Sequence, residues 1–179
     1  MKIIRLYALL QAGRQPIMIY QSLKMTVILI RSDNLNIYFT VPGEPQGKGR
    51  PRFVRKGSSV STYTPPKTVS YENRVKLAYS AQCKNYKFVD KEPLKMTIKA
   101  FFKPPVSTSK KNLDLMIDKK IRPVKKPDFD NIGKIIADSL NGIAYADDSC
   151  IVEATISKFY DIYPRTEITI ENLYTDSDM

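Results

Sequence analysis

Apolar and polar residues alternate most regularly between residues 94 and 102, where Lys or Thr occupies positions 95, 97 and 99 between apolar side chains. This period of two predicts a β-strand with one buried face. Residues 36–41 also have the composition of a strand and end at Pro42-Gly43, and two further strands are expected at 151–160 and 166–172. Both halves of the chain therefore contribute strands.

Two segments have the spacing of amphipathic helices. The first begins at Pro65-Pro66 and extends to about Lys84, and the second runs from about Asp130 to Leu140 and ends at Asn141-Gly142. Apolar residues are expected on or near one face of each helix: Val75, Leu77, Ala78 and Ala81 in the first, and Ile132, Ile135, Ile136 and Leu140 in the second. Helices packed on a sheet indicate an α+β fold.

The segments between these elements differ in character. Residues 51–63 are suited to a short hairpin or a mobile loop with Gly57-Ser58-Ser59 at its tip, whereas residues 103–126 have no apolar period and predict a long exposed loop. Residues 1–36 are interpreted as a poorly specified extension, and 37–179 as the folded domain.

The amino-terminal stretch is too often interrupted by Arg and Lys to cross a membrane. The run Leu6–Ala12 has the character of a short signal-peptide core, but the basic body with two cysteines favours the cytoplasm. Met18 and Met25 leave a different start codon open.

Charge is distributed unevenly. The net charge is +11, but residues 1–126 carry +19 and residues 127–179 carry −8. Two basic tracts stand out: Lys48, Arg50, Arg52, Arg55 and Lys56 in the first, and Lys110, Lys111, Lys119, Lys120, Arg122, Lys125 and Lys126 in the second. Such tracts favour a polyanion, and nucleic acid fits better than a membrane because no strongly amphipathic basic helix accompanies them.

Aspartates follow the second tract at once. Asp128 and Asp130 precede the second helix, and Asp147-Asp148 follow it. Carboxylates repel phosphate unless a divalent cation lies between them, so this arrangement predicts a Mg²⁺ site for phosphodiester chemistry. Asp147-Asp148 would reach it if residues 143–146 returned as a strand beside the start of the helix. Lys134, one turn above Asp130, would either hold a carboxylate in place or stabilise charge on the phosphate.

Each of these residues also has a purely structural interpretation. Asp128 or Asp130 alone is a common helix cap, Asp147-Asp148 a turn, and Lys134 a surface lysine. Glu153 is either a fourth ligand or an outward strand residue. Tyr63, Tyr71 and Tyr79 have the rings to stack on bases, although core packing is expected for the latter two.

Several reaction classes are excluded. The chain has no histidine, which removes Ser-His-Asp and Cys-His mechanisms, and its two cysteines lack metal-binding spacing. The segment 43–49 departs from the phosphate-binding loop of nucleotide enzymes in its glycine spacing, and Gly49 replaces the Ser or Thr, so no nucleotide cofactor is expected.

Together the motifs resemble the RusA family of Holliday-junction resolvases, which phages and prophages often carry. The resemblance covers about residues 37–172 and rests on four segments: Lys126-Pro-Asp-Phe-Asp-Asn-Ile-Gly-Lys134, Ile136-Ala-Asp-Ser-Leu-Asn-Gly142, Tyr145-Ala-Asp-Asp-Ser149 and Gly47-Lys-Gly-Arg-Pro-Arg52.

The resemblance implies helices on a small mixed sheet and a homodimer that nicks two opposed strands of a four-way DNA junction, with Mg²⁺, during recombination and repair. Asp128, Asp130 and Asp148 match the essential acidic positions, Lys134 matches the essential lysine, and Asp147 matches a flanking acid. The rival hypotheses are a DNA-binding module without catalysis, a less selective nuclease for flaps, forks or single strands, and an inactive prophage remnant.

Overall fold

The computed structural model describes residues 18–22, 26–31 and 34–173. Its main sheet has the order β1-β2-β3-β8-β6-β7 and is mixed, because β6 and β7 run parallel while the other pairs are antiparallel. The strands of this sheet are β1 (Met18–Ser22), β2 (Thr26–Arg31), β3 (Asn34–Pro42), β6 (Leu94–Phe102), β7 (Ile151–Tyr160) and β8 (Arg165–Asn172). Together with its helices, the sheet confirms the α+β fold.

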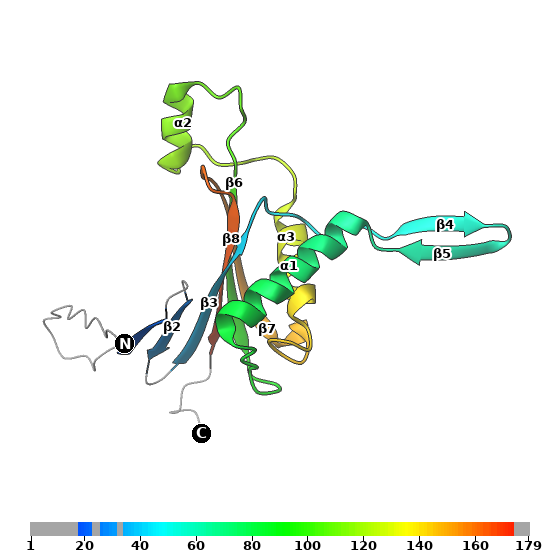
Figure 1. The fold of residues 1–179 in the computed structure, drawn as a ribbon, viewed down its shortest axis with the longest axis horizontal. Helices are drawn as coiled ribbons and strands as arrows, with labels where there is room; N and C mark the ends of the chain where they lie inside the picture. The colour runs from blue at the N-terminus through cyan, green and yellow to red at the C-terminus, as the bar shows by residue number, and fades with distance from the viewer. Residues whose placement is uncertain (1–17, 23–25, 32–33, 174–179) are drawn as a thin grey trace, which may run out of the picture.

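The remaining elements lie between these strands in the chain. They are β4 (Arg52–Lys56), β5 (Ser59–Tyr63), α1 (Pro66–Cys83), α2 (Lys110–Ile117), α3 (Phe129–Leu140) and the 3₁₀ turn η1 (Asp148–Cys150). Strands β4 and β5 form a separate hairpin that projects beyond the start of α1 (Figure 1). No helix in the described part of the chain is long and apolar enough to span a membrane.

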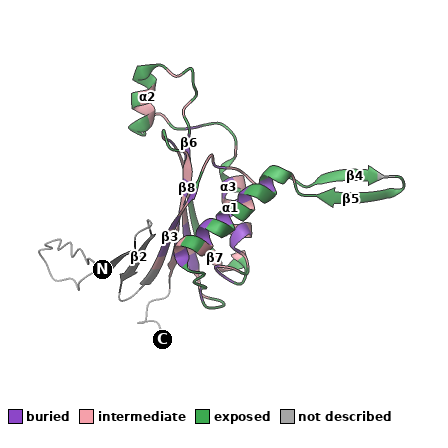
Figure 2. Ribbon diagram, viewed as in Figure 1, coloured by how far each residue is buried: buried purple, intermediate pink, exposed green. Residues whose placement is uncertain are grey.

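The core lies between one face of the sheet and helices α1 and α3. Alternate residues of β3, β6 and β8 are buried, including Phe39, Ile98 and Ile168, and they pack with Val75 of α1 and Ile135 of α3 (Figure 2). The alternation predicted for residues 94–102 is confirmed, as is the stripe of buried isoleucines in α3. These contacts fix α3 against the sheet.

The face of α1 that was predicted to be buried is confirmed only in part. Val75 and Ala78 are buried, but Leu77 is 71% exposed and Ala81 is exposed too. Two tyrosines take their place: Tyr71 and Tyr79, which are both in the core as expected. A tyrosine hydroxyl can be satisfied inside a protein, as in the 2.7 Å bond between Tyr71 and Thr166, so tyrosine extends the apolar stripe of α1 where Leu77 and Ala81 do not.

The prediction of a long exposed loop at 103–126 is confirmed in its exposure for most of the segment but was wrong in its structure, because the segment contains helix α2. The hydroxyl of Ser109 accepts a hydrogen bond from the backbone N–H of Asn112, which caps the helix. The chain after α2 is attached to the sheet through Arg122, whose guanidinium lies 3.8 Å from the ring centroid of Phe159. These contacts hold the basic segment against the end of β7.

Strands β1 and β2 fall within the segment interpreted as an extension, while residues 1–17 lie outside the described residues. The two strands continue the sheet from β3 by antiparallel pairing. A domain boundary near residue 37 remains a prediction.

Candidate nucleic-acid cleavage site

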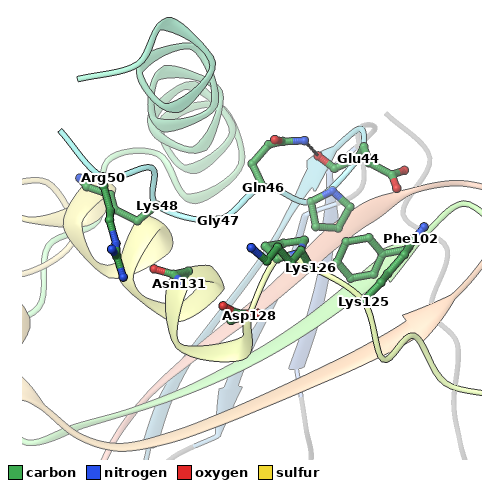
Figure 3. A pocket seen from close by; sticks show the side chains of 12 residues that line it. Glu44, Gln46, Gly47, Lys48, Arg50, Phe102, Lys125, Lys126, Asp128 and Asn131 are labelled. Atoms are coloured by element: carbon green, nitrogen blue, oxygen red, sulfur yellow. Dashed lines mark hydrogen bonds between the residues drawn. The ribbon is translucent and has the colours of Figure 1, made fainter. Parts of the chain in front are cut away.

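A cavity of about 690 Å³ lies where the loop after β3 meets the amino end of α3. Four cationic residues line it, against two acidic ones: Lys48, Arg50, Lys125 and Lys126, against Glu44 and Asp128. Figure 3 shows Lys48 and Arg50 on one side of Asp128 and Asn131, and Lys125 and Lys126 on the other. The cavity therefore joins residues from both predicted basic tracts and one predicted metal ligand.

The loop approaches α3 closely because residue 47 has no side chain. A Cβ atom at Gly47 would lie 2.8 Å from Cβ of Pro127 and 3.1 Å from Cβ of Asn131. The next backbone N–H, that of Lys48, donates a 2.8 Å hydrogen bond to the carbonyl of Asn131. Gly49 then donates to the hydroxyl of Thr68 in α1 at 3.2 Å. The loop is thus tied to both helices.

The side chain of Lys48 points along α3 rather than into open solvent. Its ammonium lies 2.5 Å from a carboxylate oxygen of Glu72 in α1 and 2.8 Å from one of Asp138 in α3. Partial burial acts to lower the pKa of Lys48, but the hydrogen bonds and charges of Asp138 and Glu72 outweigh it and raise the pKa above its ordinary value. A residue assigned to DNA contact from sequence is therefore already paired within the protein.

Asp128 and Asp130 stand at the start of α3. Asp128 occupies the N-cap position, yet its side chain makes no capping hydrogen bond, and Asp130 lies in the first turn. Both are exposed. Capping therefore does not account for the carboxylate of Asp128. Lys134 is exposed one turn after Asp130, on the same side of the helix.

Asp147 and Asp148 follow α3 in the chain, after a turn at residues 143–146. Residues 143–146 do not form the strand on which the approach of Asp147 and Asp148 to the start of the helix depended; they form a turn, which is closed by the Asn141–Tyr145 bridge. The hydroxyl of Tyr145 donates to the carbonyl of Ala137, so this turn stays beside the second half of α3. A left-handed Gly142, with φ of 71°, directs the chain into the turn.

The two aspartates have different surroundings. Asp147 accepts a 3.0 Å hydrogen bond from the backbone N–H of Ser149, and bonds from the side chain and backbone of Ser149 hold the pKa of Asp147 below its usual value. Asp148 is half-buried. The burial of Tyr145 is the main cause that raises the pKa of Tyr145, and the negative charges of Asp148 and Asp138 raise it further. Asp148 thus lies close enough to Tyr145 for their charges to interact.

Within the described ranges, no three side chains of the Asp, Glu, Cys or His type are close enough to hold one metal ion. The structure therefore places Asp128 and Asp130 at one end of α3 and does not gather Asp148 with them. The donor chemistry still fits Mg²⁺, which is commonly bound by one or two carboxylates together with substrate phosphates and water. Glu153 instead pairs with Lys95 at 3.5 Å, which supports its interpretation as a strand residue.

Three residues at the site were missed from sequence. Glu72 and Asp138 flank Lys48, and the ammonium of Lys158 in β7 donates to the carbonyl of Pro127 at 3.1 Å. Lys158 thereby fixes the backbone that leads to Asp128. Asp138 lies within the segment 136–142 of the family resemblance, but no local pattern indicates the contacts of these three residues, because their partners lie 24, 90 and 31 positions away in the chain.

The other predicted DNA contacts are divided between cavity and hairpin. Arg50, Lys125 and Lys126 are exposed residues of the cavity wall, and Arg52 and Arg55 are exposed on β4. Lys56 ends β4, and its side chain lies outside the described residues. A line of cationic positions therefore leads from the hairpin to the amino end of α3.

Comparison with known proteins gives two matches. Residues 42–171 match the family model described as endodeoxyribonuclease RusA. The chain is also similar to the uncharacterized protein YqaN of Bacillus subtilis, with 36% identity over 139 residues, which are 76% of this chain and 96% of that protein. The matched family segment contains the cavity, α3 and both pairs of aspartates.

Proposed function

Because this chain belongs to the RusA family of endodeoxyribonucleases, we propose that it is a Mg²⁺-dependent nuclease that resolves four-way DNA junctions by paired, symmetric nicks during recombination and repair. The observation that carries the proposal is the carboxylate of Asp128, which lies at a cationic cavity and is not used to cap α3. Helix capping, the ordinary role of such a residue, is thereby removed as an explanation.

The cavity supplies the groups that a scissile phosphate needs. Arg50, Lys125 and Lys126 surround the approach to α3, and the amino end of the helix adds a favourable partial positive charge for an anion. Lys134, exposed one turn into the helix, offsets negative charge that develops on the phosphate. These cations bind and orient the DNA backbone.

Asp128 and Asp130 are the residues that would hold Mg²⁺. When bound, the ion would polarise the phosphate and generate a hydroxide nucleophile from water. Asp148, and less directly Asp147, belong to the proposed ligand set by family resemblance. A substrate phosphate can complete a site built on only two carboxylates, so Asp128 and Asp130 are the minimum set.

Paired nicking requires two such sites. A homodimer with two-fold symmetry would place one site on each of two opposed junction strands. The proposal therefore includes a dimer as the active species.

The decisive experiment uses a labelled synthetic junction with the purified protein, with Mg²⁺ or with EDTA. We expect symmetric, ligatable nicks near the branch in Mg²⁺ and no product in EDTA. Asp130→Asn should reduce cleavage by a factor on the order of 100 or more while junction binding persists, because transition-state stabilisation of this kind contributes several kcal/mol.

Asp114→Asn is the matched control, because Asp114 is an exposed carboxylate on α2. It should cut like the unmodified protein. Full activity of Asp130→Asn would overturn the metal site. Faster cutting of flaps, forks or single strands than of junctions would overturn junction selectivity and leave a less selective nuclease.

A further inference from the structure

The hairpin β4–β5 is built unlike the rest of the protein. It forms a two-stranded sheet of its own and extends away from the body as a narrow arm (Figure 1). Every side chain described on its two strands is exposed (Figure 2). Such a hairpin gains little stability from a core, so its exposed side chains are accessible to an external partner, although Arg55 Nε also donates a 3.2 Å hydrogen bond to the carbonyl of Gly57.

The arm exposes apolar side chains to solvent, which is energetically unfavourable for them. Phe53 is 76% exposed and Val60 is 64% exposed. The strand register pairs Phe53 with Thr62 and Arg55 with Val60, so these four side chains share one face of the ribbon. One face of the arm thus combines an aromatic ring, a small aliphatic group and a guanidinium.

The charge of this segment is of one sign. Residues 45–71 contain six Lys or Arg residues and no Asp or Glu. This composition disfavours binding to another basic surface and favours binding to a polyanion. A two-stranded ribbon also has dimensions that fit a DNA groove.

The root of the arm is fixed to the candidate site. Immediately before β4, the backbone of Lys48 is bonded to Asn131 of α3 and that of Gly49 to Thr68 of α1. Each strand of five residues spans about 17 Å. The arm therefore reaches DNA well beyond the phosphate at Asp128 while its position relative to α3 is maintained.

We infer that this hairpin is a branch-sensing arm, in which Arg52 and Arg55 contact phosphates and Phe53 stacks on a base that is unstacked at the junction. The inference rests on the proposed function, because it takes branched DNA as the substrate. Bases at a branch point are cheaper to unstack than those in a duplex, so an exposed aromatic side chain there discriminates branched from linear DNA.

The test is DNA binding in EDTA, which separates it from cleavage. Phe53→Ala should weaken binding to a four-way junction on the order of tenfold and change binding to linear duplex by less than twofold. A 2-aminopurine base at the branch should report a fluorescence change with the unmodified protein, and this change should be lost in Phe53→Ala and largely retained in Phe53→Tyr.

Thr62→Ala is the matched control, because Thr62 is the cross-strand neighbour of Phe53 on the same face. It should bind like the unmodified protein. Equal loss of affinity for junction and duplex, or no loss at all, would overturn the inference. If Phe53→Ala changed the oligomeric state of the protein without changing its DNA binding, the arm would be assigned to contact between copies of the chain instead. Full cleavage by Asp130→Asn together with the expected 2-aminopurine signals would overturn the proposed metal site and still support the arm.

Discussion

Lys48 has two carboxylate partners from different helices, so it connects the hairpin root, α1 and α3 at a single ammonium group. Its side chain is 26% exposed, and those of Glu72 and Asp138 are 18% and 27% exposed. Charges in such a position interact more strongly than surface pairs, and removing the cation leaves two acids facing each other. Lys48 is therefore best understood as a positioning residue.

We predict that Lys48→Met lowers the free energy of unfolding by about 1–3 kcal/mol, because the carboxylates of Glu72 and Asp138 then repel each other. Urea denaturation measures this loss. Adding Glu72→Gln and Asp138→Asn should restore part of the stability.

In DNA binding, Arg55→Ala should reduce the slope of log affinity against log salt by about one, and Lys48→Met should leave this slope nearly unchanged. An equal reduction of this slope in both variants would show that Lys48 contacts a phosphate.

The two cysteines differ in accessibility. Cys83 is 3% exposed in α1, and burial raises the pKa of its thiol to about 12, whereas Cys150 is half-buried in η1. A raised thiol pKa leaves almost no thiolate at pH 8, and thiolate is the reactive form.

We expect one rapidly labelled thiol per folded chain with a maleimide at pH 8, and a second only in denaturant. Cys150→Ser should abolish the rapid phase, while Cys83→Ser should preserve it. Rapid labelling of Cys150→Ser would show that Cys83 is accessible in the folded protein.

At the scale of elements, the site depends on how closely the loop after β3 approaches α3. The approach leaves no room for a Cβ at residue 47, since the nearest atoms belong to Pro127 and Asn131 at the start of the helix. The crowded neighbours are not flexible chain ends, so the loop or the helix must shift.

Gly47→Ala should therefore reduce cleavage on the order of tenfold or more while lowering stability by about 1–3 kcal/mol. Thermal unfolding and junction cleavage measured on the same preparation separate the two effects. Gly57→Ala is a useful comparison, because a Cβ there meets nothing within 4 Å, although its φ of +61° is unfavourable for alanine. Normal cleavage by Gly47→Ala would show that the close approach is not needed for activity.

At the scale of the whole molecule, the basic and acidic residues are concentrated in different segments of the sequence, and these segments pack against each other in the fold. The acidic carboxyl-terminal segment supplies α3, β7 and β8, and the basic segment supplies the arm, the cavity wall and α2. Under the proposed function, one chain would supply one cleavage site, whereas paired nicking of two opposed strands needs two.

Paired nicking therefore predicts a dimer. Light scattering should give about twice the 20.5 kDa mass of the chain at the concentrations used for cleavage. On a supercoiled cruciform plasmid, the two nicks should occur within one binding event and yield linear product directly. A monomer that releases singly nicked circles would contradict the symmetric mechanism.

Local patterns in the sequence determined much of this structure. The period of two in β6 and the isoleucine spacing in α3 identified both elements, because burial on one face imposes the same period on every strand or helix that packs on a core. For residues 51–63 the hairpin, one of the two alternatives predicted, is the one that forms, and the aspartates at the start of α3 were predicted for similar local reasons. Helix α2 was missed because its few half-buried residues, among them Met116, give no clear apolar period.

Tertiary structure alone decided what the charged residues do. Lys48 stood in a basic tract, but folding brought Glu72 and Asp138 to its ammonium and changed its role. Asp148 was expected to share an ion with Asp128 and Asp130, but no three acidic side chains gather within the described residues, and Asp148 interacts with Tyr145 after the turn. Periodicity records which face of an element is buried, whereas the partner of a charge depends on which distant segments meet, and that is determined only when the chain packs.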